Sequence, residues 1–154
     1  NEHRDGILRR SVAPAPVDPA IARAAEAAAV ALAEALELVG LLAVEFFVTE
    51  DGQVLVNEIA PRPHNSGHWT QDGCATSQFE QFVRAVVGLP LGPVDALFET
   101  EMLNLIGDDA NDWPALIADP TAKLHLYGKA EARPGRKMGH VNRRLRPWPS
   151  DRPA

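Results

Sequence analysis

Two β-rich runs that meet at Asp51-Gly52 constrain the fold of this chain more than any other feature. The runs are LLAVEFFVTE at residues 41–50 and QVLVNEIA at residues 53–60. Asp-Gly between such runs is a strong hairpin signal, because a type I′ turn needs a positive φ at both central residues. If the turn has two residues, Val48 pairs with Leu55 and Glu45 pairs with Glu58. The sequence therefore predicts an antiparallel hairpin with two glutamates on one face.

The paired glutamates indicate that a cation lies between them. Opposed side chains in an antiparallel pair have Cβ atoms about 4.5–5.5 Å apart, and like charges there are destabilising. A magnesium ion takes one or two carboxylates and completes its shell with water and phosphate oxygens. The alternatives are a glutamate that keeps its proton, and an ion pair with Arg62 or another basic group. The inference depends on the register, since a one-residue slip would send the two glutamates to opposite faces.

The loop at residues 60–73, which follows the hairpin, is dense in hydrogen-bond donors, and such loops usually face a ligand. Its polar and aromatic side chains are Arg62, His64, Asn65, Ser66, His68, Trp69 and Gln71. His64 and His68 have the spacing of a zinc pair on a helix, but Gly67 and two nearby prolines argue against a helix. Zinc is therefore not predicted. Arg62, stiffened between those prolines, suits bidentate recognition of phosphate or carboxylate, or an ion pair with an acidic neighbour.

Two segments are predicted to be helices that pack against a sheet. The first runs from about Asp18 to Val39, because Asp18 followed by proline is a helix start and Gly40 supplies a stop. The second begins with the capping box at residues 77–80 and ends at Gly88. Both have apolar side chains at helical spacing. Residues 1–16 are interpreted as a short apolar run followed by a proline-rich connector.

The chain changes character after residue 88. EMLNLIG and AKLHLYG are predicted strands, DWPALIAD is a short helix capped by Asp112, and KAEARPGRKMGHV is a hairpin that turns near Pro134-Gly135. We therefore expect an α+β fold with two domains, residues 1–88 and residues 89–154. The second domain is small and β-rich.

Charge is unevenly distributed along the chain. Residues 1–120 hold 6 Lys and Arg against 19 Asp and Glu, whereas residues 121–154 hold 9 against 2. Nucleic-acid binding is nevertheless not expected, because aromatic side chains are not interleaved with the basic ones and the isoelectric point is about 5.3. The basic hairpin either binds a phosphate or is a solvated turn. Its basic residues are Lys129, Arg133, Arg136 and Lys137.

The remaining composition is typical of a cytoplasmic protein. The single cysteine, Cys74, cannot form an internal disulfide, which fits a reducing compartment. The longest apolar run is broken by Glu45 and is far shorter than a bilayer span, and no secretory leader pattern opens the sequence. No association with a membrane is expected.

Three segments together resemble a known family. They are VNEIAPRPHNSGHWTQDGCATSQFEQFVRAVVGLPLG, NLIGDD and LHLYGKAEARPGRKMGHVN. They are similar to the C-terminal part of the 5-(carboxyamino)imidazole ribonucleotide synthases, ATP-grasp enzymes of purine synthesis. For residues 1–88 the resemblance implies the C-terminal half of an ATP-grasp domain, an antiparallel sheet with packing helices. For residues 89–154 it implies a small β-rich domain with a basic hairpin and a flexible tail.

The resemblance also implies an activity and its cofactors. Phosphoryl transfer from ATP activates bicarbonate as carboxyphosphate, and the carboxyl group then passes to the amino group of aminoimidazole ribonucleotide. The product is 5-(carboxyamino)imidazole ribonucleotide. Positioning and charge neutralisation carry most of such catalysis. ATP and magnesium, or manganese in its place, are the implied cofactors.

Matches to the family's motifs imply a metal site and an ATP site. The family's metal-binding glutamates fall on Glu45 and Glu58, and Asn57 with Glu58 matches the pair that contacts the nucleotide. Many ATP-grasp enzymes add an asparagine two residues beyond the second glutamate. Ala60 stands at that position here, so water is expected in place of a third protein ligand.

Further matches imply a substrate site. Arg62, His64 and Asn65 match the loop that lines the ribonucleotide and bicarbonate site, and Arg62 is the candidate catalytic residue that stabilises charge on the carboxyphosphate. Lys129 and Arg136 match residues that hold the 5′-phosphate. His68 and Trp69 are expected to pack and brace the loop rather than to react.

Finally, the family implies partners beyond this chain. A dinucleotide-fold-like domain and a small lid domain precede these segments in the family, so activity is expected of this chain together with a missing N-terminal part, as a homodimer. One alternative is a non-catalytic module that binds metal or phosphate or docks on another subunit. Another is a formate-using ATP-grasp transferase that acts on glycinamide ribonucleotide. The HNSGHWT and RPGRK segments favour the carboxylating family.

Overall fold

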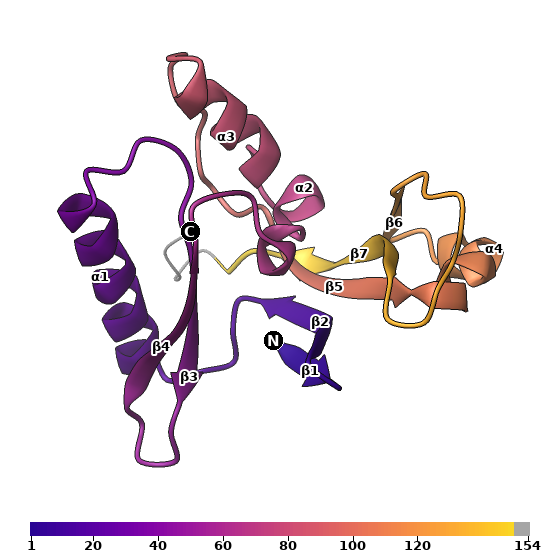
Figure 1. Cartoon of the computed structure of the whole chain (residues 1–154), viewed down its shortest axis with the longest axis horizontal. Coiled ribbons are helices and arrows are strands. Elements are labelled where there is room, and N and C mark those ends of the chain that lie inside the picture. Colours follow the sequence, from indigo (N-terminus) through magenta and orange to yellow (C-terminus); the bar gives the residue numbers. More distant parts are fainter. Residues whose placement is uncertain (150–154) are drawn as a thin grey trace.

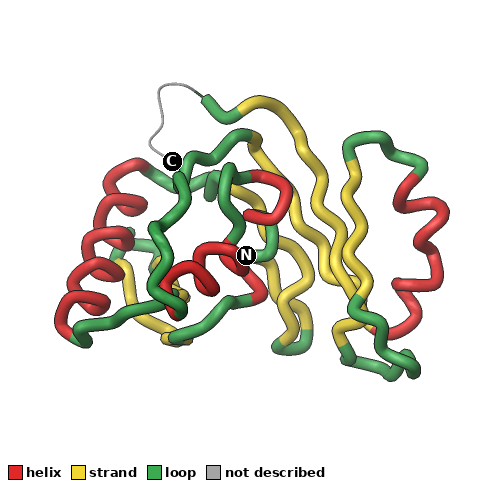
Figure 2. The backbone as a smooth tube through the Cα atoms, turned by 90° about the horizontal axis from the view of Figure 1, so that it is seen from above, coloured by secondary structure: helices red, strands yellow, loops and turns green. Residues whose placement is uncertain are grey.

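The computed structural model describes residues 1–149, whose strands form two antiparallel sheets (Figure 1 and Figure 2). The larger sheet has the order β1-β2-β5-β7-β6, and the smaller one is the hairpin β3-β4. The strands are β1 (Glu2–Arg4), β2 (Ile7–Ala13), β3 (Ala43–Val48), β4 (Val54–Ala60), β5 (Phe98–Ile106), β6 (Ala122–Leu126) and β7 (Lys137–Pro147). The helices are α1 (Pro19–Ala35), α2 (Thr70–Gly73), α3 (Gln78–Val86) and α4 (Trp113–Ile117), with 3-10 turns η1 (Asn65–Gly67) and η2 (Gly107–Asp112). The predicted α+β class is confirmed.

The core lies on the larger sheet, whose centre is formed by β5 and β7. Most of the buried apolar side chains come from its strands: Leu8, Ala13, Met102, Leu105, Ile106, Met138 and Val141. Figure 1 shows α1 beside the β3-β4 hairpin at one end of the molecule and α4 at the other. The hairpin is therefore peripheral, and it packs mainly on α1. Among the described residues, no helix is both long enough and apolar enough to span a bilayer.

The interpretation of residues 1–16 as an apolar run and a connector is wrong for residues 2–13, which form β1 and β2, whereas residues 14–16 do connect β2 to α1. Two arginines inside β2 hide its alternating pattern, and each has a partner on or beside the sheet. Arg10 Nε donates to Glu101 Oε1 on β5 at 2.6 Å, and Arg9 lies 3.3 Å from Asp109. The cross-strand ion pairs let charged side chains occupy a strand of the central sheet.

Strands on both sides of the predicted domain boundary belong to one sheet. β2 pairs with β5, and Ser11 lies opposite Met102. The division into residues 1–88 and residues 89–154 stays a prediction.

The predicted β3-β4 hairpin is confirmed, but its turn does not have two residues. The Thr49 N–H donates to Gln53 O at 3.0 Å, the Gly52 N–H donates to Thr49 O at 2.9 Å, and Gly52 has φ of +81°. This is a three-residue loop with glycine in the left-handed position. Asp51 favours the wider turn, since its carboxylate accepts hydrogen bonds from Thr49 Oγ1 and Gln53 Nε2, and these hydrogen bonds lower its pKa.

The wider turn shifts the register by one residue, and a β-bulge in β4 shifts it back. Near the turn Val48 pairs with Val54, not with Leu55 as predicted. The register then changes at Asn57, the extra residue of the bulge, so that Glu45 still faces Glu58. The predicted pairing of the two glutamates is therefore correct, although the predicted turn is wrong.

The first predicted helix begins where expected and ends early. Asp18 Oδ1 accepts a hydrogen bond from the Ala20 N–H at 2.7 Å, but α1 stops at Ala35 rather than near Val39. Glu37 adopts a positive φ of 47°, and the Leu38 N–H donates back to Ala33 O at 3.1 Å. The helix thus ends in a Schellman motif that uses a glutamate where glycine is usual.

The second predicted helix, α3, agrees with the sequence at both ends. Ser77 Oγ accepts from the Glu80 N–H at 3.2 Å, and Gly88 takes φ of +71° after the last turn. The loop before it differs from the prediction, because residues 60–73 include the 3-10 turn η1 and the short helix α2. His64 and His68 flank η1 and do not share a helix, as expected.

The predicted hairpin at residues 129–141 is wrong in its first arm. β7 pairs with β6 instead, and residues 127–136 form the loop between them, with a turn closed by the Arg136 N–H and Arg133 O at 2.9 Å. β7 also continues through Pro147, beyond the end of the predicted hairpin. Residues 150–154 of the predicted flexible tail lie outside the described residues.

Candidate active site

His64 lies between the two glutamates that the hairpin sets face to face. Its Nδ1 is 3.7 Å from Glu45 Oε1, and its Nε2 is 3.5 Å from Glu58 Oε1. The side chain of Glu45 is 15% exposed and that of Glu58 is 53% exposed. One carboxylate is thus sheltered and the other reaches solvent, with one imidazole bridging them. This arrangement places a polar, positively chargeable ring where two negative charges meet.

The two glutamates have no lysine or arginine partner within 4.0 Å among residues 1–149. The alternative that Arg62 neutralises Glu58 is therefore wrong, since Arg62 Nη1 donates to Pro63 O at 3.1 Å. No three histidine, cysteine or acidic side chains of the described part are placed to hold a metal ion together. Two carboxylates are nevertheless enough for magnesium, which takes its other ligands from water and phosphate. The donor set fits such an ion.

Lys137, one of the basic residues of the predicted hairpin, also belongs to this group, although it was not predicted as a site residue. Burial lowers the pKa of Lys137, and the positive charges of Arg62 and Lys129 lower it further. The charges of Glu45 and Glu58 act in the opposite direction. The side chain of Lys137, the first residue of β7, is therefore close enough to both glutamates and to both basic side chains for their charges to change its pKa. The position of Lys137 directly after the RPGR segment is the sequence feature that could have identified it as a site residue.

The other two basic candidates differ in where they point. Lys129 Nζ donates to Lys137 O at 2.5 Å and lies 5.4 Å from the centre of the Tyr127 ring. Arg136 Nη1 donates to Glu131 O at 3.1 Å, within the same loop. The structure thus brings Lys129 to Lys137, whereas the guanidinium of Arg136 is held by its own loop.

Two asparagines of the predicted site have different surroundings. Asn57 is exposed in the bulge of β4. Asn65 exchanges two hydrogen bonds with Asn104 of β5, at 2.9 and 2.7 Å, and Asn104 also donates to Leu8 O at 2.9 Å. Asn65 therefore anchors the loop to the central sheet. Its role as a substrate ligand, like that of Asn57 toward ATP, stays a prediction.

His68 and Trp69 pack, as expected from the sequence. The His68 ring lies 4.8 Å from the His140 ring, and Trp69 stacks on Trp148 with ring centres 6.2 Å apart. Burial lowers the pKa of His68 to about 4 and that of His140 to about 3. Both rings are consequently neutral at physiological pH, which suits a packing role.

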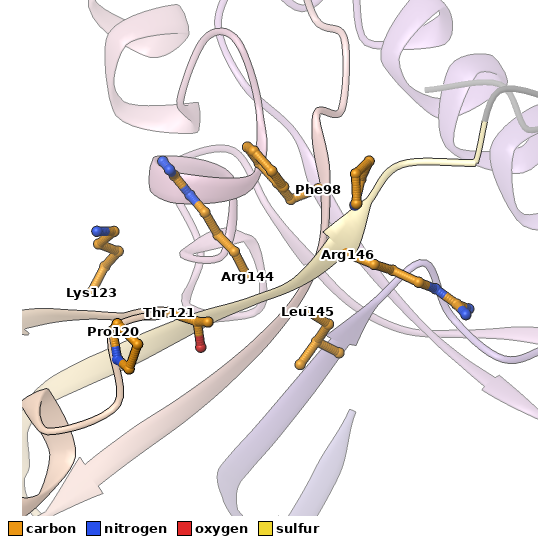
Figure 3. A pocket seen from close by; sticks show the side chains of 8 residues that line it. Phe98, Pro120, Thr121, Lys123, Arg144, Leu145 and Arg146 are labelled. Carbon is orange, nitrogen blue, oxygen red and sulfur yellow. The ribbon is translucent and has the colours of Figure 1, made fainter.

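Two hollows lie apart from the paired glutamates. One of about 310 Å³ lies on β6 and β7 and is lined by Phe98, Pro120, Thr121, Lys123, Arg144, Leu145, Arg146 and Pro147 (Figure 3). Figure 3 shows Arg144 and Arg146 pointing to opposite sides of β7, and the Arg144 guanidinium lies 4.8 Å from the centre of the Phe98 ring. A second hollow, of about 640 Å³, is lined by His68, Gln71, Phe79, Leu124, His125, Leu126, Tyr127 and His140. Neither includes a predicted catalytic, metal or substrate residue.

Two family models match the chain. Residues 1–79 match the ATP-grasp domain, and residues 100–145 match the phosphoribosylaminoimidazole carboxylase C-terminal domain. The first match spans the β3-β4 hairpin with both glutamates, and the second spans Lys129, Arg136 and Lys137.

Relatives and solved structures agree with these matches. An N5-carboxyaminoimidazole ribonucleotide synthase of Brucella melitensis is 57% identical over 143 residues, which are 93% of this chain and 40% of the relative. The structure of an N5-carboxyaminoimidazole ribonucleotide synthetase in complex with ADP superposes with a TM-score of 0.90 at 48% identity, covering 94% of this chain and 39% of that one. An Aspergillus clavatus synthase bound to ADP and 5-aminoimidazole ribonucleotide gives 0.88 at 37% identity, covering 94% and 41%. The chain thus spans about 40% of the length of these proteins.

Proposed function

Because this chain belongs to the ATP-grasp family, and because its relatives are N5-carboxyaminoimidazole ribonucleotide synthases, we propose that it is the C-terminal portion of such a synthase. The complete protein then carboxylates 5-aminoimidazole ribonucleotide with bicarbonate and ATP. Phosphoryl transfer from ATP to bicarbonate gives carboxyphosphate and ADP. The amino group of the ribonucleotide then attacks the carboxyl carbon, the bond to phosphate breaks, and the amine loses a proton.

The observation that carries this proposal is the pairing of Glu45 with Glu58 around His64. The two carboxylates would hold magnesium, or manganese, which supplies charge neutralisation for the transferred phosphoryl group when bound. Asn57, next to Glu58 in the bulge, would contact the nucleotide. The bulge turns this exposed side chain out of the regular alternation of the strand.

Basic side chains around the glutamates complete the site. Arg62 lies in the loop that follows β4 and would stabilise the negative charge of carboxyphosphate, with Lys137 as a second cation. The charges of Arg62, Glu45 and Glu58 all act on the pKa of Lys137, which supports this assignment. His64 and Asn65 would line the ribonucleotide and bicarbonate site, and Lys129 and Arg136 would hold the 5′-phosphate.

The remaining 60% of a synthase would pack on surfaces that this chain leaves open. Large apolar side chains of the hairpin are exposed, namely Phe47, Val48, Leu55, Val56 and Ile59. Large exposed apolar side chains gathered on one hairpin are typical of an interface. We propose that the N-terminal part covers them, and that the complete protein is a cytoplasmic homodimer, as the family resemblance implies.

Phosphate release from ATP tests the proposal. We expect release that depends on both aminoimidazole ribonucleotide and bicarbonate when this chain is mixed with, or fused to, the N-terminal part of a close relative. The chain alone should release none. Absence of activity in the mixture and in the fusion would favour a non-catalytic module. Activity that requires formate and glycinamide ribonucleotide instead would identify the rival transferase.

A further inference from the structure

Gln78, the first residue of α3, holds the backbone of His64 with both ends of its side-chain amide. Its Oε1 accepts from the His64 N–H at 3.0 Å, and its Nε2 donates to His64 O at 2.8 Å. Gln78 is 7% exposed, so these bonds form away from competing water. The side-chain amide of Gln78 therefore satisfies both backbone groups of His64, as a neighbouring β-strand would do.

The same amide also contacts His68. Gln78 Nε2 lies 2.8 Å from His68 Nδ1. Since Oε1 is committed to the His64 N–H, the group that faces His68 is the NH2, and His68 Nδ1 must accept. His68 is then neutral with its proton on Nε2. Gln78 thus joins the two histidines of the loop, which lie four residues apart.

Gly67 makes room for this contact. A Cβ atom at Gly67 would lie 2.6 Å from Gln78 Oε1 and 3.0 Å from its Cδ. Any larger residue would displace the amide from His64. The His64 ring is held separately, since its Nδ1 lies 2.9 Å from Ser66 Oγ. Gln78 thus holds the backbone of His64, and Ser66 holds its ring.

From this geometry we infer that Gln78 is a positioning residue that sets His64 between Glu45 and Glu58. The claim about position stands on the contacts of this chain, whereas its effect on turnover rests on the proposed function. Among the described residues no hydrogen bond joins Gln78 to either glutamate, so it acts through His64. Removing its amide should loosen the loop at the point where it crosses the paired carboxylates.

The same helix provides a matched control in Gln81. Gln81 Nε2 donates to Gly92 O at 3.0 Å, and its Oε1 accepts from the Gly92 N–H at 2.9 Å. This is the same two-bond clamp, made from the same side-chain type on the same helix, but it holds the loop between α3 and β5 instead of the loop that contains His64. Gln78→Met and Gln81→Met each remove one clamp with little change in side-chain volume.

Hydrogen exchange and imidazole nuclear magnetic resonance in the 154-residue chain test the position. In Q78M the His64 amide should exchange roughly tenfold or more faster, since its hydrogen bond is lost, whereas in Q81M it should not change. In Gln78→Glu a carboxylate faces His68 Nδ1, so His68 should titrate well above its present pKa of about 4. Equal His64 exchange in Q78M and Q81M, or an unchanged His68 titration in Q78E, would overturn the inference.

Kinetics of the chain completed with the N-terminal part test the consequence. Because small misplacements of a catalytic constellation reduce rates by up to about 100-fold, we expect Q78M to lower kcat by about 10- to 100-fold and Q81M by less than about threefold. A merely structural role would give both variants the same kcat at equal folded fraction, and would refute the inference. An inactive unsubstituted protein would instead refute the proposed function, while exchange and titration still decide the position of His64.

Discussion

Acidification should destabilise this chain through two buried histidines well before its carboxylates are protonated. His140 is 1% exposed and lies between the rings of His68 and His125, at 4.8 and 4.5 Å. Burial is the main cause of the low pKa values of His140, about 3, and of His68, about 4. Repulsion from Lys137 and from neighbouring histidines, when these are protonated, lowers the pKa of His68 further, and the same repulsion from neighbouring histidines lowers that of His140. Asp72 raises the pKa of His140. The folded state therefore holds both rings neutral where the unfolded chain would protonate them.

The size of the effect follows from proton uptake on unfolding. A group whose folded pKa lies below its unfolded value stabilises the fold above the unfolded pKa, and this stability is lost as the pH falls toward the folded pKa. Each unfolded histidine binds its proton near pH 6.5, and each further pH unit is worth about 1.4 kcal/mol. From about pH 7.5 to about pH 5.5 the two histidines together should lower the free energy of unfolding by about 2.5 kcal/mol.

Urea unfolding at a series of pH values measures this loss. The pKa values of Asp51, Asp72 and Asp119 are lowered, so their contributions disappear only below about pH 4 and do not overlap with the histidine interval. In His140→Asn, which cannot titrate, the loss over the same interval should fall to about half. A full loss in H140N, or a flat stability profile in the unsubstituted chain, would show that these histidines are not held neutral.

Three further predictions concern the site. Glu58→Gln should reduce kcat of the completed enzyme by at least about 100-fold and weaken manganese binding while circular dichroism stays unchanged; a near-normal rate would remove Glu58 from the metal site. Arg136→Ala should raise the KM for aminoimidazole ribonucleotide about tenfold or more with little change in kcat, and an unchanged KM would contradict the phosphate role. Gly67→Ala should lower the free energy of unfolding by about 1–3 kcal/mol in urea titrations, since its Cβ would lie 2.6 Å from Gln78 Oε1. An unchanged free energy of unfolding would mean that the Gln78 side chain can move aside without loss of stability.

Features that depend on neighbours in sequence were the ones predicted best. The caps at Asp18 and Ser77 and the two strands of the hairpin follow from short-range patterns, and the structure confirms them. The pairing of Glu45 with Glu58 was also correct, but only because the wider turn and the bulge shift the register in opposite directions. Asp-Gly predicts a two-residue turn strongly. The side-chain hydrogen bonds that widen this turn, and the bulge in β4, have no sequence pattern of comparable strength.

Features that depend on distant residues were missed. β2 looks like a connector because Arg10 interrupts its pattern, and its partner Glu101 lies 91 residues away. Gln78 was counted only as part of a helix start, since nothing in its local sequence shows that its amide returns to His64. Asn104 was likewise only part of a motif until the structure paired it with Asn65. Long-range hydrogen bonds between polar side chains leave no periodic signal in a sequence.

The pairing of β2 with β5 makes the middle of the chain an insertion into a sheet. The chain leaves the sheet after Ala13 and rejoins it at Phe98, just before Thr100, which is the partner of Ala13 in the register. The segment between these two points, which includes both glutamates and the loop with His64, is a single insertion whose two ends are held together in the sheet. The entropic cost of closing a loop of this length opposes folding by about 4 kcal/mol. Lys129 and Lys137 belong to the sheet side. The insertion thus carries both glutamates and Arg62, whereas its host carries Lys129 and Lys137, and the two junctions set the distance between these two groups.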